Sequence, residues 1–197
     1  MIAKRIFDLF FVIPGLLLLS PAFLIISIRI KKDSDGPVFF RQERVGLNGK
    51  RFQVLKFRTM VENAEEIGPK ITTSCDSRIT KSGLWLRKYK ADELPQLINV
   101  LKGEMSLVGP RPEVPEYVAF YPEKERKEIL SVLPGVTDKA SIEFRNENDL
   151  LSGSTDLVKD YREKVLPIKL SYYMQYVKER SLKGDFLLIL RTIAVII

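Results

Sequence analysis

The chain has 197 residues, with 32 Lys and Arg against 25 Asp and Glu, a single cysteine and no histidine. The lack of histidine excludes Ser-His-Asp and Cys-His nucleophile pairs and every metal site ligated by histidine. A lone cysteine, Cys75, cannot form a disulfide within the chain or a zinc cluster. Chemistry must therefore come from carboxylates, amines, hydroxyls or a hard metal ion bound by oxygen.

The length favours one domain, and the positive charge is concentrated at its start. Residues 1–60 hold eleven basic and four acidic side chains, which accounts for the whole net charge of +7. This local excess indicates anionic lipid or a phosphorylated ligand near the N-terminal part. It argues against a nucleic-acid partner for the whole domain.

A long apolar segment lies near the start of the chain. Twenty uncharged residues run between Asp8 and Arg29, which meets the threshold of about 18–20 residues for a membrane span. Pro21 removes the helical partner of the Leu17 carbonyl. The hydroxyl of Ser20 is the nearest replacement donor, because it can bond back into the preceding turn.

Two topologies fit this segment: a kinked transmembrane helix, or a re-entrant helix-break-helix with its break at Ser20-Pro21. Residues 9–19 reach roughly 16 Å as a helix, about half of the ~30 Å hydrocarbon core. Basic residues flank both ends of the segment, so the positive-inside rule draws both ends to the cytoplasm. We favour the re-entrant form, and the single-pass protein with an extracytoplasmic domain remains the alternative.

A β-hairpin is predicted over 38–60, with its turn at Asn48-Gly49. The second strand changes its pattern at Val54 and Leu55, which indicates a bulge or a strand buried on both faces. Lys56 and Arg58 point the same way from this strand. On local evidence alone they form a solvated strand face.

Several further helices are expected. They lie at the start of 61–75, at Thr80–Tyr89, around Pro122–Leu130, from about Asp156 to Arg180, and from Leu182 to the end. The last helix is apolar nearly all round, so it is either a core helix or one that lies in a membrane interface.

The most informative stretch is residues 90–116. Four leucine and isoleucine residues between 94 and 101 form one apolar helix face, and Gly103 ends the helix. Asp92 fits an N-cap, which places Asp92 and Glu93 at the positive end of a helix dipole. An ordinary acidic N-cap is the plain interpretation of this pair, and a phosphate or metal site is the functional one.

The stiff turn Gly109-Pro110-Arg111-Pro112 favours the phosphate or metal site over an ordinary N-cap. Its two prolines fix the backbone around one guanidinium. An arginine held in this way is suited to bidentate binding of phosphate. Acids at a helix start, cations just before them and a rigid Arg111 after them predict a site for phosphoryl chemistry. The acids are suited to Mg²⁺.

The motifs KRIFDLFF, FRQERVGLNGKRFQVLKFRTM, ADELPQLINVLKGEMSLVGPRPE, LPGVT and RSLKGDFLLILRTI together resemble the bacterial sugar transferase family, the small monotopic phosphoglycosyl transferases. The resemblance covers nearly the whole chain. It implies an α+β, mainly helical fold with a re-entrant helix broken at Ser20-Pro21, a short β-hairpin and amphipathic interfacial helices around a small globular catalytic domain. Residues 1–32 would then form the membrane helix with its basic flanks, and residues 33–197 the catalytic domain.

The resemblance also implies a reaction. Such enzymes move a sugar 1-phosphate from a UDP-sugar to undecaprenyl phosphate and release UMP, through an aspartyl-phosphosugar intermediate with Mg²⁺. By motif, Asp92 is the nucleophile and the contact to Mg²⁺, and Glu93 is its partner carboxylate. Lys56 and Arg111 resemble the family's phosphate-binding cations, and Arg58 joins them as a substrate-binding residue on the strand face of Lys56.

These implications place the enzyme on the cytoplasmic face of a bacterial inner membrane, as a monotopic protein with membrane lipid and downstream glycosyltransferases as partners and no nucleic acid. The alternative function is a non-catalytic peripheral module that binds anionic lipid through its basic N-terminal region. Residues 138–141 and Tyr173 depart from the common family pattern. No sugar-contacting residue is therefore carried over.

Overall fold

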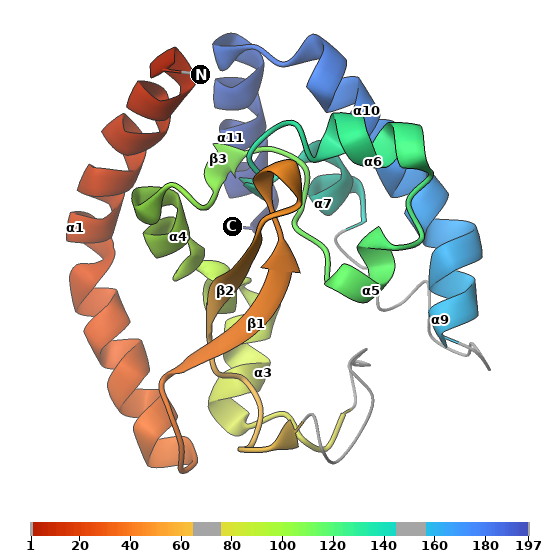
Figure 1. Ribbon diagram of the computed structural model, residues 1–197. Helices are drawn as coiled ribbons and strands as arrows, with labels where there is room; N and C mark the ends of the chain where they lie inside the picture. Colours follow the sequence, from red (N-terminus) through yellow and green to blue (C-terminus); the bar gives the residue numbers. More distant parts are fainter. Residues whose placement is uncertain (1, 65–75, 145–156, 197) are drawn as a thin grey trace.

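The computed structural model describes residues 2–64, 76–144 and 157–196, and it shows a mainly helical α+β chain with two small sheets (Figure 1). The helix expected at the start of 61–75 lies largely outside the described residues, as does Cys75. The polar segment before the C-terminal helices lies outside them at 145–156.

The apolar N-terminal segment is the long helix α1 (Ile2–Asp33), which contains both Pro14 and Pro21. It is drawn in Figure 1 as one curved helix along the side of the molecule, so the break expected at Ser20-Pro21 does not interrupt the helix. Ser20 Oγ donates to the Leu17 carbonyl at 2.8 Å, which confirms the predicted replacement donor. Among the described helices, α1 alone has the length and hydropathy that a membrane crossing requires.

Both ends of α1 are attached to the rest of the chain. Its buried residues lie in two groups, Asp8 and Val12 near the start and Ile26 and Ile30 near the end. At the start, Arg5 Nη2 also donates to the Leu101 carbonyl at 2.8 Å. Between the two groups the helix is largely exposed, and its outward leucines and isoleucines include Leu17, Leu18, Leu24 and Ile25.

The predicted hairpin is confirmed. It consists of β1 (Phe39–Val45) and β2 (Arg51–Phe57), antiparallel and joined by the short turn η1 (Leu47–Gly49). Asn48 and Gly49 both have positive φ, the conformation for which Asn-Gly is selected. The pairing is regular along the whole hairpin and Val54 and Leu55 are both buried, so β2 is a strand buried on both faces and has no bulge.

The helix predicted over Thr80–Tyr89 is α3 (Lys81–Lys88), and Thr80 is its N-cap, whose hydroxyl accepts from Gly83 N at 3.0 Å. Helix α4 (Gln96–Lys102) ends at Gly103, which has a φ of 83° as a left-handed C-cap. The N-cap predicted at Asp92 is wrong, because α4 starts after Pro95. Asp92 lies instead in the separate 3₁₀ turn η2 (Ala91–Glu93), which follows Lys90 in the left-handed region.

The buried side chain of Asn99 joins α4 to the hairpin. Its Nδ2 donates to the Gln53 carbonyl at 2.8 Å, and its Oδ1 accepts from Leu55 N at 2.9 Å. One amide side chain therefore pairs with the free edge of β2 as a neighbouring strand would, and it fixes the distance between this strand and α4.

The rest of the chain wraps around this centre. Its elements are β3 (Ser106–Val108), α5 (Pro115–Val118), α6 (Glu123–Ile129), β4 (Gly135–Thr137), α7 (Lys139–Glu143), α9 (Leu157–Asp160), η3 (Tyr161–Val165), α10 (Leu166–Glu179) and α11 (Leu182–Ile196). Strands β3 and β4 pair in parallel. The segment η3 is a π-helical turn before Pro167, which has no N–H to bond the carbonyl four residues back.

The sequence left two alternatives for the last helix, a core helix or one that lies in a membrane interface. In the structure this helix, α11, is not a core helix, because one side of it is exposed. Its large apolar side chains at Leu182, Phe186, Leu187, Leu190 and Ile193 are between 41% and 50% exposed. Only the opposite side of the helix packs on β3, β4 and α7. The helix therefore presents an apolar face to its surroundings.

We predict that Asn99→Ala lowers the free energy of unfolding by roughly 2–4 kcal/mol, because it leaves the buried Leu55 N–H and the partly buried Gln53 carbonyl of β2 without their partner. Urea unfolding of the protein in detergent, followed by circular dichroism, measures this change. Gln175→Ala removes an exposed amide from α10 and serves as the control, with a change of about 0.5 kcal/mol or less. Equal effects of the two substitutions would contradict the role given to Asn99.

Candidate active site

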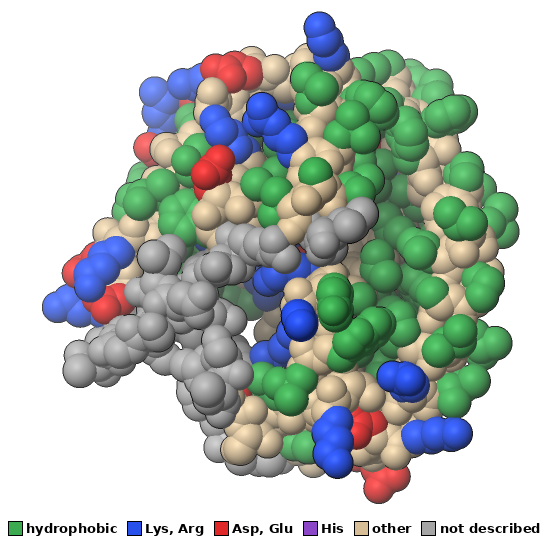
Figure 2. All heavy atoms as spheres, turned by 180° about the vertical axis from the view of Figure 1, so that it is seen from behind, with side chains coloured by type: hydrophobic (Ala, Val, Ile, Leu, Met, Phe, Trp, Pro, Cys, Tyr) green, Lys and Arg blue, Asp and Glu red, His purple; other side chains and the backbone are tan. Residues whose placement is uncertain are grey.

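A cavity of about 1390 Å³ opens beside the hairpin, η2 and α11. Ten of the described residues that line it are Lys or Arg, and only three are Asp or Glu: Glu62, Asp92 and Glu93. Figure 2 shows Lys and Arg side chains around the middle of this face. A cavity with this excess of cations is suited to a ligand that carries several negative charges.

Asp92 is the acid of this cavity that has an uncommitted oxygen. The side chain is 9% exposed, and its Oδ1 is buried with no hydrogen-bond partner among the described residues. Burial, followed by the nearby charge of Glu93, raises the pKa of Asp92. A carboxylate that is poorly solvated and poorly paired is a stronger nucleophile than one held in a salt bridge.

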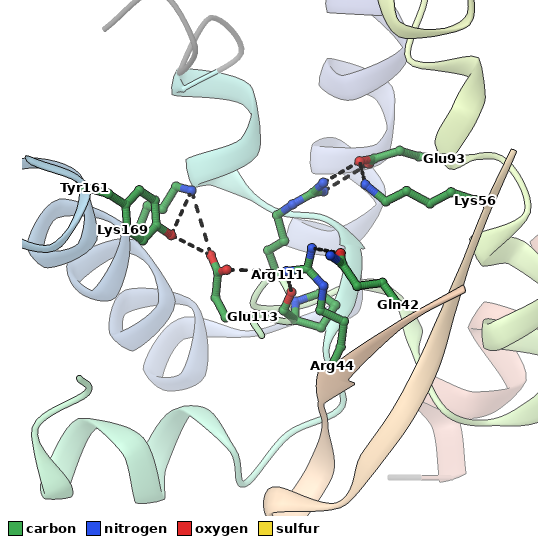
Figure 3. Close-up of polar contacts among 9 residues, drawn as sticks. Gln42, Arg44, Lys56, Glu93, Arg111, Glu113, Tyr161 and Lys169 are labelled. Atoms are coloured by element: carbon green, nitrogen blue, oxygen red, sulfur yellow. Dashed lines mark hydrogen bonds and ion pairs between the residues drawn. The ribbon is translucent and has the colours of Figure 1, made fainter. Parts of the chain in front are cut away.

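Glu93 has the opposite surroundings. Its Oε1 accepts from Lys56 Nζ at 2.8 Å, and Arg111 binds both of its oxygens, with Nη1 to Oε2 at 3.0 Å (Figure 3). Burial alone would raise the pKa of Glu93, but Arg111 and Lys56 together hold it well below its usual value. Two adjacent carboxylates are therefore set apart: one is fixed as an anion between two cations, and the other lies free beside them.

Lys56 is not on a solvated strand face. It is partly buried and extends from β2 to Glu93 on η2. Burial lowers the pKa of Lys56, and Glu93 acts in the opposite direction. Local sequence could not distinguish Lys56 from a surface lysine. In the structure this lysine joins the hairpin to the Asp92–Glu93 pair, which we call the dyad.

The turn that carries Arg111 is fixed by the parallel pair β3 and β4. Gly109 N donates to the Thr137 carbonyl at 3.1 Å, and Gly135 N donates to the Pro110 carbonyl at 2.9 Å. A Cβ at Gly135 would lie 2.1 Å from Gly109 N, so only glycine allows this approach. The turn that the two prolines predicted to be stiff is therefore also held by hydrogen bonds to β4.

A group of polar residues that sequence reasoning missed holds the other side of this turn. Arg44 Nη1 donates to the Pro112 carbonyl at 3.1 Å and lies 3.5 Å from Glu113 Oε2. Tyr161 OH donates to Glu113 Oε1 at 2.8 Å, and Lys169 Nζ lies 3.9 Å from the same oxygen (Figure 3). Four side chains from β1, the turn, η3 and α10 thus brace the backbone next to Arg111.

No local signal pointed to that brace. Glu113 directly follows the GPRP turn and Arg44 lies in the hairpin motif, but Tyr161 and Lys169 come from a helical stretch that is about fifty residues away in sequence. Only the packing of α10 against the rest of the chain brings them to Glu113.

Arg58 does not bond Glu93 as the other two predicted substrate-binding residues, Lys56 and Arg111, do. Its guanidinium donates to the backbone carbonyls of Ser34, at 2.7 Å, and Asp35, just after α1. It is 6% exposed, although it also lines the cavity. The structure thus gives Arg58 a role in fixing the backbone after the end of α1, and the solvated-face interpretation is wrong for it too.

The three cations that precede the dyad in sequence, Arg87, Lys88 and Lys90, all line the cavity. Arg87 Nε donates to Thr59 Oγ1 at 2.9 Å, which directs this side chain across from α3 toward β2. Burial lowers the pKa of Arg87, and the charge of Asp92 acts in the opposite direction. Because all three cations line the cavity, their positions favour a role in binding an anion there over a role limited to the C-terminal end of the helix dipole.

The described residues contain no cluster of three or more acids, cysteines or histidines that would enclose a metal ion. Asp92 Oδ1 is a free hard donor, whereas the oxygens of Glu93 are bound to Lys56 and Arg111. Mg²⁺ commonly binds one or two carboxylates together with water and substrate phosphates. The donor set therefore fits Mg²⁺ held by Asp92 and a phosphorylated ligand.

Comparison with known proteins places this geometry in a family. The family model described as "Bacterial sugar transferase" matches residues 1–197. A UDP-N-acetylgalactosamine-undecaprenyl-phosphate N-acetylgalactosaminephosphotransferase of Aeromonas hydrophila is 36% identical over 98% of this chain and 43% of its own length. A UDP-glucose:undecaprenyl-phosphate glucose-1-phosphate transferase of Caulobacter vibrioides is 36% identical over 96% of this chain and 68% of its own length.

The lengths of these relatives differ widely. The chain matches 22% of an undecaprenyl-phosphate glucose phosphotransferase of Komagataeibacter xylinus, at 47% identity over 59% of its own residues. It thus spans less than half of the Komagataeibacter and Aeromonas proteins and about two thirds of the Caulobacter protein. The match of the family model over all 197 residues nevertheless includes every part of the site. The chain belongs to the bacterial sugar transferase family.

Proposed function

We propose that this protein is a phosphoglycosyl transferase that moves a sugar 1-phosphate from a UDP-sugar to undecaprenyl phosphate and releases UMP. The observation that carries the proposal is the pair of carboxylates with opposite surroundings: Asp92 with a free buried oxygen, and Glu93 bound between Lys56 and Arg111. The names of the relatives, which transfer sugar phosphates to undecaprenyl phosphate, support it.

The reaction proceeds in two displacements at one phosphorus atom. An oxygen of Asp92 attacks the phosphorus attached to the sugar, and the bond to the bridging oxygen breaks, so that its electron pair leaves with UMP. An oxygen of undecaprenyl phosphate then attacks the same phosphorus, and the bond to Asp92 breaks to restore the carboxylate. Neither step needs a general base, because both nucleophiles are already anions.

Lys56 and Arg111 neutralise the charge that builds up on the phosphoryl oxygens. Glu93 keeps these two cations together, and Arg111 retains further N–H groups for a phosphate after it has bound Glu93. Mg²⁺ bound by Asp92 and the diphosphate would supply additional charge neutralisation and orient the substrate.

The attachment of α1 to the rest of the chain supports one membrane topology over the other. Arg5 bonds the end of α4, and Arg58 bonds the carbonyls after the end of α1, so the same globular body holds both ends of the helix. A helix that crosses the bilayer would place those two ends, and the parts of the globular body bound to them, on opposite sides of the membrane. We therefore propose that the continuous, curved α1 is a monotopic anchor that stays in one leaflet of the inner membrane, with residues 33–197 on its cytoplasmic face.

We predict that Asp92→Asn reduces turnover by a factor on the order of 10³ or more, as loss of a nucleophile typically does. Wild-type protein given a UDP-sugar labelled in the phosphate next to the sugar should retain label in the absence of acceptor, and the variant should retain none. Asp35→Asn, at an exposed aspartate outside the cavity, is the matched control. Full turnover by Asp92→Asn would contradict the assignment of Asp92 as the nucleophile, whereas the peripheral lipid-binding module predicts no UMP release by the wild-type protein from any donor.

We predict that Glu93→Gln moves the acidic limb of the kcat/KM profile for the donor to lower pH. Burial and the charge of Glu93 raise the pKa of Asp92, whereas the neighbouring cations lower it. Removal of the Glu93 charge therefore lowers this pKa, and Asp92 stays ionised in more acidic solution. The control Glu43→Gln, on the exposed hairpin, should leave the limb in place; a limb unmoved or raised in Glu93→Gln would contradict the coupling.

The topology is tested with single cysteines placed at Ile2 and Lys32 in a Cys75→Ser background. A maleimide that cannot cross membranes should label both positions only after the cells are opened, because both ends of α1 lie in the cytoplasm. Labelling of either position in intact spheroplasts would indicate the single-pass alternative.

A further inference from the structure

One side of the cavity is apolar and is formed by elements that lie next to the membrane helix. We define the α11 wall as the cavity-lining residues Leu97 of α4, Leu107 of β3, Val136 of β4, and Ile189 and Ile193 of α11. It is continuous with the charged part of the cavity at two points. Leu97 lies one helical turn after the dyad, and Val136 lies next to Thr137, which bonds the Arg111 turn at Gly109.

The α11 wall is built on a fixed base. Leu97, Leu107 and Val136 pack against the buried cluster that contains Val12 of α1 and Val100 of α4. Two contacts hold α11 in place over this base. Thr192 Oγ1 lies 2.7 Å from Thr137 Oγ1 at one end, and Asp185 Oδ2 lies 2.8 Å from Lys4 Nζ at the other.

The α11 wall offers little to a polar ligand. Its described lining from α11, β3 and β4 is apolar apart from Thr137 and Thr192, and these two hydroxyls are bonded to each other. A uracil ring or a sugar placed here would lose hydrogen bonds to water without replacement. A hydrocarbon chain would lose none.

The α11 wall also opens toward the face that suits lipid. Ile193 lines the cavity and is still 49% exposed, and Phe186, Leu187 and Leu190 on the same helix are exposed beside it. The rings of Phe186 and Phe11 lie 6.1 Å apart, which joins this surface to α1. Figure 2 shows hydrophobic side chains gathered over one half of the molecule, next to the central cations.

The size of the cavity supports two occupants. Its volume of about 1390 Å³ exceeds the roughly 300–1000 Å³ of a usual small-molecule site. One of the two occupants would have to fit both the cationic part and the α11 wall. Such a ligand has a phosphate at one end, for Lys56 and Arg111, and a hydrocarbon chain at the other.

Resting on the proposed function, we infer that the α11 wall is the binding subsite for the first isoprene units of the polyprenyl phosphate acceptor. The chain enters along the exposed face of α11 beside α1, and its phosphate reaches the phosphorus held on Asp92. The donor occupies the cationic part between Lys56 and Arg87. The two substrates thus approach the dyad from different sides of one cavity.

The test uses Ile189→Trp, which fills the α11 wall, and Leu187→Trp, which adds the same volume to the exposed side of the same helix. Ile189→Trp should raise the KM for undecaprenyl phosphate about 10-fold or more. The burst of UMP released from UDP-sugar alone should remain at the wild-type level, because it needs only the donor and Asp92. Leu187→Trp should change neither quantity.

Ile189→Asn provides a second variant that makes the α11 wall polar without adding bulk to it, and its KM for the acceptor should also rise. A truncated acceptor with two isoprene units separates subsite binding from membrane partition, since Ile189→Trp should impair it as strongly as the full-length lipid. A slower UMP burst in Ile189→Trp would assign the α11 wall to the donor and overturn the inference. Unchanged acceptor KM in both Ile189 variants would also overturn it.

The proposed function fails in a different way. If wild-type protein releases no UMP from any UDP-sugar, the reaction itself is wrong. The subsite is then tested by binding alone, with a fluorescent polyprenyl phosphate titrated into the protein in nanodiscs. Weaker binding by Ile189→Trp than by Leu187→Trp supports the subsite, and equal binding rejects it.

Discussion

The ion pairs of Glu93 with Lys56 and Arg111 connect the three parts from which the site is made. Lys56 belongs to β2, Glu93 to the turn η2, and Arg111 to the turn after β3. Because Glu93 has both cations as partners, the cost of removing its charge from water is offset, and the carboxylate remains ionised. The same pairs leave Asp92 as the neighbouring acid with a free oxygen. The positions of the proposed nucleophile and of the proposed phosphate-binding cations thus depend on one partly buried carboxylate.

The supports around this centre act on the backbone. Asn99 fixes β2 relative to α4, Gly135 allows the close approach of β4 to the Arg111 turn, and Glu113 receives Arg44 and Tyr161 on the other side. Positions held to a fraction of an ångström matter for phosphoryl transfer, since its catalysis consists mainly of orientation and charge neutralisation. Because orientation and charge neutralisation need no general base, the proposed phosphoryl transfer is compatible with a chain that has no histidine. Its two proposed substrates bring anions of their own.

Helix α1 and the candidate site are parts of one structure. The cluster that contains Val12 of α1 also supports Leu107 and Val136, which line the cavity. Lys4 at the start of α1 holds Asp185 of α11, and Thr192, two turns further along the same side of α11, lines the cavity. Helix α1 is therefore not a tether appended to an independent domain. It forms part of the base on which the proposed acceptor subsite is built.

The sequence by itself determined the local features: the apolar N-terminal helix, the hairpin at Asn48-Gly49, the helix that follows Thr80, the helix end at Gly103, and the stiff turn around Arg111. These depend on hydropathy and on backbone preferences of residues close in sequence. The N-cap expected at Asp92 was wrong, since Pro95 and the left-handed Lys90 set the helix start from both sides. Only the tertiary structure decided that Lys56 faces Glu93, that Arg58 fixes the backbone after α1, and that Tyr161 and Lys169 brace Glu113. The reason is physical: whether a charged side chain lies in water or against a counter-charge depends on which distant elements pack around it, and no periodicity within one segment records that.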